Sequence, residues 1–236
     1  MHWDASSRQV NCKKRRHVRA PCCWMIVAQW ALAASANQLD GGLRMHGPWW
    51  YSWGGLNQSM FLAINHAGNG WLWNHLALWG TAAGDHTLFP IYAALTLALA
   101  LKRPNWLAAQ AVLVFLVGYV IDWGIVSSIK PWLDFPRPAK ALGEGVVHVL
   151  GRTEYFHSFP SGHAAFAFVL TASLVPGAHW VLKVILVLFA LWVGWSRMAV
   201  GAHFPADVLG GALIGVFAAW LSAQALRLAG YARVTR

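Results

Sequence analysis

Charged residues are scarce in this 236-residue chain, in which Asp, Glu, Lys and Arg together make up 11% of the sequence. Soluble domains carry about 25% charged residues, so much of this chain is not expected to face water. Hydrophobic residues make up 58%, which excludes an ordinary soluble domain. The sequence contains no internal repeat and no low-complexity segment, and we expect one membrane domain.

Cysteine is also rare. The three cysteines, Cys12, Cys22 and Cys23, lie near the first apolar run, and no His or Cys stands at zinc-finger spacing from them. We therefore interpret them as structural or incidental residues and expect no zinc finger.

Basic residues exceed acidic ones by 18 to 8, which by itself would suggest a nucleic-acid partner. Their distribution argues against one, because five basic residues lie between 13 and 19, before the first apolar run. Three more, Arg227, Arg233 and Arg236, follow the last run. Such positions are typical of cytoplasmic anchoring beside anionic lipid, and no nucleic acid is expected as a partner.

Apolar runs predict an all-α polytopic membrane protein with six transmembrane helices. The expected spans are 21–36, 86–101, 106–129, 161–176, 184–195 and 208–226. Many of the 16 tryptophans lie beside the ends of these runs, as in the aromatic belts of membrane proteins. The segment 56–69 has helical spacing but is too polar to span, which favours an interfacial position.

The first apolar run leaves two interpretations open. Its Ala-Ser-Ala end resembles the cleavage site of a signal peptide, but the run also fits a short first span, which we favour. The chain then consists of a basic cytoplasmic segment (1–20), one membrane-embedded domain (21–228) and a cytoplasmic tail (229–236). The positive-inside rule places Lys102 and Arg103 on the cytoplasmic side with both termini. The polar stretches 130–160 and 196–207 consequently face the outside.

The sequence Pro160-Ser161-Gly162-His163 stands at the end of the first polar stretch. Proline is tolerated in the first turn of a helix and an apolar run follows, so this motif predicts a helix start. Free backbone N–H groups at a helix start bind phosphate well. The backbone of Ser161 and Gly162 is thus a candidate phosphate site, with His163 as a proton donor beside it.

Two further motifs are expected on the same face. One places six residues between Lys130 and Arg137, and the other places five residues between Arg197 and His203 and three between His203 and Asp207. The three cations can balance a phosphate dianion and the charge on its oxygens in the transition state. Because no carboxylate cluster suited to Mg²⁺ lies nearby, we expect these cations to replace a metal, and we expect no cofactor.

Together the three motifs resemble, in residue type, order and spacing, the signature of the type 2 phosphatidic acid phosphatase superfamily. This superfamily also includes glucose-6-phosphatase-like enzymes and vanadium haloperoxidases. The signature runs from 130 to 207, and the six-span layout extends the resemblance over most of the chain. It implies a phosphatidic acid phosphatase/haloperoxidase-like helix bundle.

The resemblance also implies roles for three residues. His203 would be the nucleophile that forms a phosphohistidine, Asp207 would orient it, and His163 would protonate the leaving oxygen. An Asp that keeps one imidazole nitrogen protonated leaves the other free to attack. Their spacing puts His203 and Asp207 on one face if the segment joining them is helical. A metal site made by these three residues is a less favoured alternative.

Four other ionisable residues have no role in the motifs. Asp85 and Asp122 lie in or beside apolar runs, and we expect them to pair with a basic side chain or a backbone group. His157 and Glu154 are candidates for shaping substrate access.

The resemblance implies a membrane lipid phosphatase whose active site faces the periplasm or the outside of the bacterial inner membrane. Expected substrates are undecaprenyl diphosphate, phosphatidylglycerol phosphate, phosphatidic acid or lipid A, with a slight preference for the first. Phosphotransfer to another acceptor and a vanadate-dependent haloperoxidase are alternatives that use the same residues. A transporter is disfavoured because the charges gather at one face instead of along a midplane path. The sequence leaves the oligomeric state open.

Overall fold

The computed structural model describes residues 48–68 and 70–231, and these form helices joined by loops. No β-strand forms among them, and a single isolated bridge joins Leu107 to Ala178. The all-α prediction is confirmed for this part of the chain. The predicted first span (21–36), the basic segment (1–20) and the last five residues lie outside the described residues.

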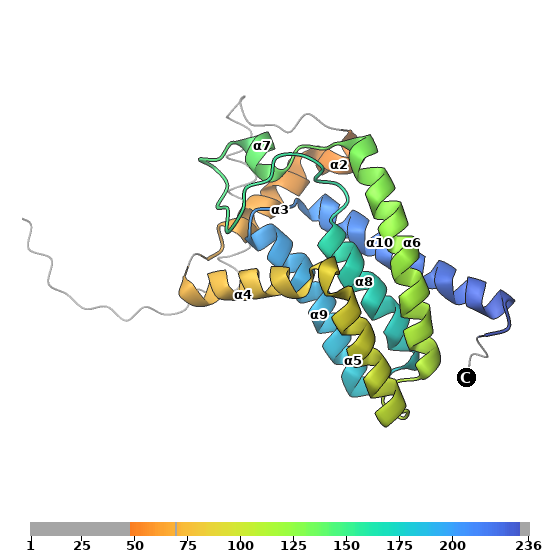
Figure 1. Ribbon diagram of the computed structural model, residues 1–236. Coiled ribbons are helices and arrows are strands. Elements are labelled where there is room, and N and C mark those ends of the chain that lie inside the picture. The colour runs from red at the N-terminus through yellow and green to blue at the C-terminus, as the bar shows by residue number, and fades with distance from the viewer. Residues whose placement is uncertain (1–47, 69, 232–236) are drawn as a thin grey trace, which may run out of the picture. The chain divides into compact units, whose positions relative to one another are not determined.

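The helices follow one another as labelled in Figure 1. In chain order they are α2 (Trp49–Ser52), η1 (Trp53–Gly55), α3 (Leu56–Asn65), α4 (Trp71–Ala83), η2 (His86–Leu88), α5 (Phe89–Lys102), α6 (Ala109–Leu133), α7 (Pro138–Leu142), α8 (Gly162–Leu174), η3 (Val175–Gly177), α9 (Trp180–Ala199) and α10 (Pro205–Leu228). The short helices α2, α3 and α7 lie at one end of the bundle, and the connection between α5 and α6 lies at the other.

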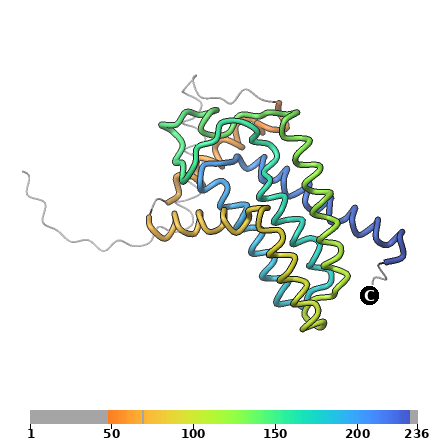
Figure 2. Tube along the Cα trace, in the orientation of Figure 1, coloured from red at the N-terminus to blue at the C-terminus, as the bar shows by residue number. Residues whose placement is uncertain are grey.

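Helix α8 lies inside the bundle, packed against α6, α9 and α10 (Figure 2). Two glycines of α10 make the closest part of this packing possible. A Cβ atom on Gly211 would stand 2.3 Å from the Ser161 carbonyl oxygen, and one on Gly215 would stand 2.4 Å from the Ala165 carbonyl oxygen. Small residues let two helix backbones approach in this way. The start of α10 is thereby held against the start of α8.

Helices α4 and α5 form a bent pair, with an angle of 52° between them. The bend is stabilised at Asp85, whose carboxylate accepts a hydrogen bond of 2.8 Å from the Thr87 N–H and so caps η2. Next to it, a Cβ on Gly84 would come within 2.4 Å of the Val193 side chain, so α4 meets α9 closely at this point. The predicted span 86–101 corresponds to η2 and α5.

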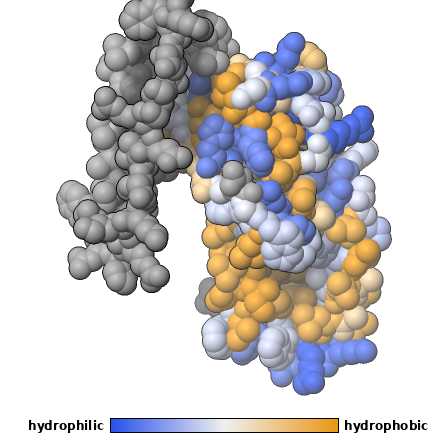
Figure 3. Space-filling view, turned by 90° about the vertical axis from the view of Figure 1, so that its left-hand side faces the viewer, coloured by the Kyte–Doolittle hydropathy of each residue, from blue (hydrophilic) through white to orange (hydrophobic). Residues whose placement is uncertain are grey.

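Three described helical segments are long and apolar enough to cross a membrane: Ala109–Leu142, Trp180–Ala199 and Pro205–Leu228. The bent pair adds a fourth if it counts as one span, and Gly162–Gly177 is apolar but shorter. The predicted count of six therefore stays a prediction. Many large hydrophobic side chains on these helices are exposed, and in Figure 3 hydrophobic residues cover much of the lower part of one face. This surface is typical of a membrane protein.

The helices reach further into the motifs than the sequence suggested. Lys130 was expected to begin a loop but lies in the last turn of α6, and Arg197 was expected in a polar hairpin but lies in the last turn of α9. The helix dipole stabilises a cation in the last turn of a helix. A helix can therefore continue through these basic residues and need not end before them. Conversely, His203 precedes α10, whereas Asp207 lies in its first turn.

The close approach of α8 and α10 predicts that Gly215→Ala destabilises the protein. The added methyl group would meet backbone atoms at 2.4 and 2.7 Å, so the helices must separate. Overpacking of this kind costs about 1–3 kcal/mol. The matched control is Gly124→Ala in α6, where a Cβ would meet nothing within 4 Å. Thermal unfolding in detergent should show a lower midpoint for Gly215→Ala alone, and equal midpoints would contradict this packing.

Candidate active site

Backbone hydrogen bonds bring the three motifs together at one end of the bundle. The Ser161 N–H donates to the Asp207 carbonyl at 3.0 Å, which joins the starts of α8 and α10. The His203 N–H donates to the Arg197 carbonyl at 3.1 Å, which folds the loop after α9 back over that helix. The Arg137 N–H donates at 2.8 Å to a carbonyl of the loop before α8. The expectation that the motifs share one end is therefore met.

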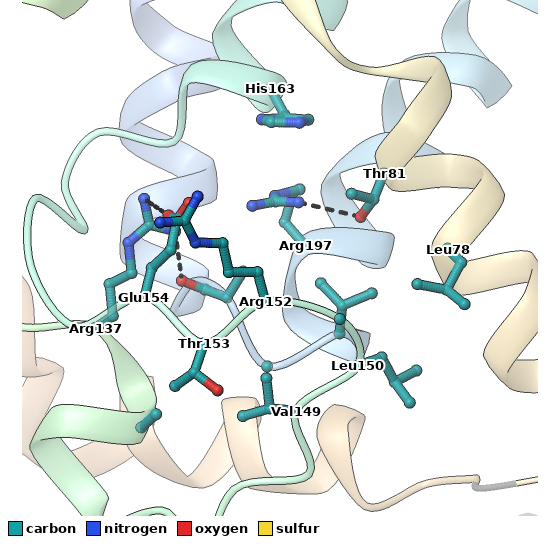
Figure 4. Close-up of a pocket in the computed structure, with 15 residues that line it drawn as sticks. Leu78, Thr81, Arg137, Val149, Leu150, Arg152, Thr153, Glu154, His163 and Arg197 are labelled. Carbon is teal, nitrogen blue, oxygen red and sulfur yellow. Dashed lines mark hydrogen bonds and ion pairs between the residues drawn. The ribbon is translucent and has the colours of Figure 1, made fainter.

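Two cavities flank the gathered side chains. The first, of about 260 Å³, lies between α4 and the loop 149–154 (Figure 4). The second, of about 310 Å³, lies against α6 and is also lined by Lys130 and His203. Four side chains line both cavities: Arg137, Glu154, His163 and Arg197. The two cavities thus meet at three residues that the motifs single out and at Glu154.

The two arginines are almost fully buried, at 7% exposure each, and both are held in place by neutral acceptors. Arg137 donates from Nε to the Phe156 carbonyl at 3.0 Å and from Nη1 to the Ala202 carbonyl at 3.4 Å. Arg197 donates from Nη1 to Thr81 Oγ1 at 3.2 Å, as Figure 4 shows. Within the described residues, Arg197 Nε has no hydrogen-bond partner. A buried, incompletely paired guanidinium is suited to binding an anion.

Glu154 supplies the acidic partner of Arg137. Its Oε2 lies 2.5 Å from Arg137 Nη2, and its side chain is half exposed while that of Arg137 is buried. Figure 4 shows this ion pair facing the same space as the His163 ring and the Arg197 guanidinium. A phosphate that binds to Arg137 would therefore compete with the Glu154 carboxylate.

The start of α8 differs in one detail from the sequence prediction. The Ser161 N–H was expected to donate to phosphate, but it is bonded to the Asp207 carbonyl because the two helices approach so closely. Ser161 Oγ is buried without a hydrogen-bond partner among the described residues. The N–H groups of the first helical turn, including that of Gly162, have no acceptor within the helix. His163 stands in this first turn and lines both cavities.

The neighbours of His203 determine which of its ring nitrogens carries the proton. Nε2 lies 3.5 Å from Arg137 Nη1, and Nδ1 lies 3.4 Å from Asp207 Oδ2, a close approach that does not form a hydrogen bond in this geometry. Because a guanidinium can only donate, Nε2 is assigned as the acceptor and Nδ1 as the protonated nitrogen facing the carboxylate. Burial, together with the nearby Arg137 and Arg197 charges, lowers the pKa of His203 well below its usual value. The result is a neutral imidazole whose Nε2 lone pair faces Arg137.

Sequence reasoning missed three residues of the site. Thr81 orients Arg197, while the hydroxyl groups of Tyr51 and Ser158 both donate to the Asp207 carboxylate. Thr81 lies in an apolar helix and Tyr51 in a segment rich in Trp and Gly, so neither is marked by a motif. Ser158 directly precedes the Phe159-Pro160 pair, and its nearness to the helix-start motif was the one available signal.

The remaining acidic residues and His157 take other positions. Asp85 pairs with a backbone N–H, as expected, and Asp122 is buried in α6 on the wall of the second cavity. Among the described residues, Asp122 Oδ1 has no hydrogen-bond partner, so the expected pairing is absent for that atom. His157 lies 2.9 Å from Asp134 on the exposed surface and lines neither cavity. No group of three or more His, Cys, Asp or Glu residues within 48–68 and 70–231 could hold a metal ion.

The fold and the gathered motifs define a class of protein. The family profile described as "PAP2 superfamily" matches residues 111–230, just over half of the chain, and the chain belongs to this family. The resemblance inferred from the motifs is thereby confirmed.

The chain is similar to several named proteins and to solved structures. The chain is 32% identical over 139 residues to a "Lipid A 4'-phosphatase" of Bacteroides thetaiotaomicron, covering 56% of this chain and 61% of that protein. It is 27% identical over 176 residues to an "Undecaprenyl-diphosphatase" of Sulfolobus acidocaldarius, covering 72% and 78%. Among solved structures, Aquifex aeolicus LpxE matches with a TM-score of 0.62 at 30% identity, covering 72% of this chain and 95% of that one.

A second solved structure shows the fold alone, because its identity to this chain is 22%. It is a transmembrane PAP2-type phosphatidylglycerolphosphate phosphatase from Bacillus subtilis, with a TM-score of 0.60 over 90% of this chain and 98% of that one.

The ion pair between Glu154 and Arg137 predicts that Glu154→Gln strengthens the binding of orthovanadate, a phosphate mimic. Removing the competing carboxylate frees the Arg137 charge, and since pairs with one exposed partner contribute little, we expect a Kd about two- to fivefold lower. Isothermal titration calorimetry on the detergent-purified protein would measure it. Glu144→Gln is the control, because Glu144 pairs with Tyr155 away from both cavities. Weaker or equal binding by Glu154→Gln would refute the competition.

Proposed function

We propose that this protein is an integral membrane lipid phosphatase that releases phosphate through a phosphohistidine on His203. The observation that carries the proposal is the setting of His203, whose Nε2 lies 3.5 Å from Arg137 while Nδ1 faces Asp207. A neutral imidazole in this tautomer has its nucleophilic lone pair where a phosphate bound to the arginines would lie. The phosphatase names of the relatives support the same chemistry.

In the first step, His203 Nε2 attacks phosphorus while the bond from phosphorus to the leaving oxygen breaks. The His163 imidazolium gives its proton to that oxygen, and Asp207 stabilises the positive charge that develops on the His203 ring. Lys130, Arg137 and Arg197 balance the charge on the equatorial oxygens. A positioned acid of this kind contributes about 10²–10⁴-fold in rate.

In the second step, water attacks the phosphorus of the phosphohistidine. His163, now neutral, takes the proton that the water loses, and the bond between phosphorus and His203 Nε2 breaks. Free phosphate leaves, and both histidines return to their starting protonation states. The same two residues thus serve as acid and nucleophile first and as base and leaving group second.

The second cavity suits a substrate whose tail remains in lipid. Its α6 wall carries Tyr119, Trp123 and Val126 beside Lys130, and Trp123 is more than half exposed on the outer surface of the bundle. An apolar wall that leads to a cationic end matches an amphiphilic phosphate ester or diphosphate. We propose undecaprenyl diphosphate as the first candidate and lipid A, phosphatidylglycerol phosphate and phosphatidic acid as the others.

The proposed orientation puts this site on the outer face of a bacterial inner membrane, with both termini in the cytoplasm. It is supported by Lys102 and Arg103, which stand at the end of the bundle opposite to the site.

The proposed mechanism predicts phosphate release that survives excess EDTA and is lost in His203→Ala. The variant lacks the nucleophile, so we expect activity to fall below about one thousandth of the wild-type value. Phosphate release by the detergent-purified protein would be measured with the four lipids side by side. His157→Ala is the matched control, since His157 lines neither cavity, and it should keep full activity.

Each contrary outcome has a defined meaning. Activity abolished by EDTA would indicate a metal centre in place of a histidine nucleophile. Activity that persists in His203→Ala would contradict the phosphohistidine mechanism. No release from any of the four lipids would refute lipid phosphatase function.

The proposed orientation predicts that a cysteine at Lys140, in a background without Cys12, Cys22 and Cys23, reacts with an impermeant thiol reagent in intact cells. Lys140 is exposed in α7, at the end of the bundle that carries the site. Gel-shift labelling before and after permeabilisation measures this, with a cysteine at Lys102 as the opposite control. Labelling of position 140 only after permeabilisation would reverse the orientation.

A further inference from the structure

The carboxylate of Asp207 is completely buried, with 0% exposure, and is surrounded by donors. Its Oδ1 accepts a hydrogen bond of 2.8 Å from the Tyr51 hydroxyl. Its Oδ2 accepts one of 2.6 Å from Ser158 Oγ and one of 2.8 Å from the Phe204 N–H, and lies 3.4 Å from His203 Nδ1. Hydrogen bonds from other groups thus fix both oxygens of the carboxylate next to the imidazole.

We propose that Tyr51 and Ser158 are positioning residues for the phosphatase reaction, which fix the Asp207 carboxylate so that it holds the attacking tautomer of His203. This inference rests on the proposed function of His203. Neither hydroxyl lines either cavity, so both residues act through Asp207 and not on the substrate.

Tyr51 reaches Asp207 from a distant part of the chain, since it belongs to α2 while Asp207 lies in the first turn of α10. Its ring stacks on Phe135 at a centroid distance of 4.4 Å and meets Phe159 and Phe204 edge-on, so its hydroxyl has little freedom to move. Burial and the Asp207 charge raise the pKa of Tyr51 above its usual value. The phenol therefore keeps its proton and is the donor.

Ser158 is held as firmly. It is completely buried, and its N–H donates to the Phe135 carbonyl at 2.9 Å. Phe135 thus contacts both positioning residues, one through its ring and the other through its backbone. The hydroxyl of Ser158 is left directed at Asp207 Oδ2.

Two physical effects follow from these hydrogen bonds. The terminal torsion of an Asp side chain is broad, so fixing Oδ1 through Tyr51 prevents the carboxylate from rotating Oδ2 away from His203. Hydrogen bonds donated to a buried carboxylate also favour its charged form, which is the form that can accept the Nδ1–H of His203. Loss of either hydroxyl would let the imidazole move its proton to Nε2, the nitrogen that must attack.

Tyr51→Phe and Ser158→Ala each test this proposal by removing one hydroxyl with little change in shape. With undecaprenyl diphosphate and the three other lipids, we expect kcat to fall about 10- to 100-fold while KM stays within about twofold, since a hydrogen bond to a charged group is lost but no substrate contact is. The double variant should approach Asp207→Asn and not exceed it, because all act through one carboxylate.

Matched controls remove hydroxyls from a partly buried tyrosine and a buried serine elsewhere. Tyr92→Phe loses a hydrogen bond of 2.8 Å to the Ala83 carbonyl, and Ser222→Ala loses one of 2.8 Å to the Val114 carbonyl. These variants should lower the thermal midpoint by similar amounts but leave kcat unchanged. If the controls lower kcat as much as Tyr51→Phe and Ser158→Ala do, the effect is structural and the proposal is wrong.

A second measurement does not depend on activity. In protein labelled with ¹⁵N-histidine, the ring signals of His203, identified by their loss in His203→Asn, should show a protonated Nδ1 in the wild type. The Nε2-protonated form should gain population in Tyr51→Phe and Ser158→Ala. An unchanged tautomer with unchanged kcat in both variants would overturn the proposal. If the wild type hydrolyses none of the lipids but the variants show the tautomer shift, the proposed function alone is overturned.

Discussion

The contact between the starts of α8 and α10 is the constraint on which the rest of the site depends. Glycines at 211 and 215 let the α10 backbone approach α8 so closely that the Ser161 N–H bonds to the Asp207 carbonyl. This bond joins the helix that carries His163 to the helix whose first turn carries Asp207. An acid and a nucleophile must act on opposite sides of one phosphorus atom, so their separation has to be fixed by rigid elements rather than by loops.

The second constraint is electrostatic. Arg137 and Arg197 are buried at the end of an apolar bundle and bond mainly to carbonyls and a hydroxyl, which satisfy donors without cancelling charge. Glu154 is the acidic side chain paired with Arg137 among the residues that the structure describes, and it is half exposed, so an incoming phosphate can replace it at low cost. In the free protein the two arginines therefore remain charged and fixed in position, and an anion can take the place of Glu154 beside Arg137.

The sequence predicted the motif residues and their common end because spacing and order carry that information locally. It did not predict that Lys130 and Arg197 would lie inside helices, because a charge beside an apolar run was interpreted as the start of a loop. It placed His203 and Asp207 on one face only if the segment joining them is helical, whereas His203 precedes α10 and a turn before Pro205 brings the two side chains together. Tyr51 could not be found in this way, since its contact with Asp207 is set by the packing of aromatic rings from four separate segments.

These aromatic contacts explain why a segment outside the matched family region bears on the chemistry. The family match begins at residue 111, yet Tyr51 closes the far side of the Asp207 carboxylate. Asn57 of the same region accepts a hydrogen bond of 2.9 Å from the Ala206 N–H, and Asn65 of α3 donates to the His148 and Ala199 carbonyls. The segment 49–65 thus satisfies backbone groups on both sides of His203. In the proposed mechanism, a loop held from behind in this way stays ordered without support from the substrate, which would leave the binding free energy of the phosphate available for the reaction itself.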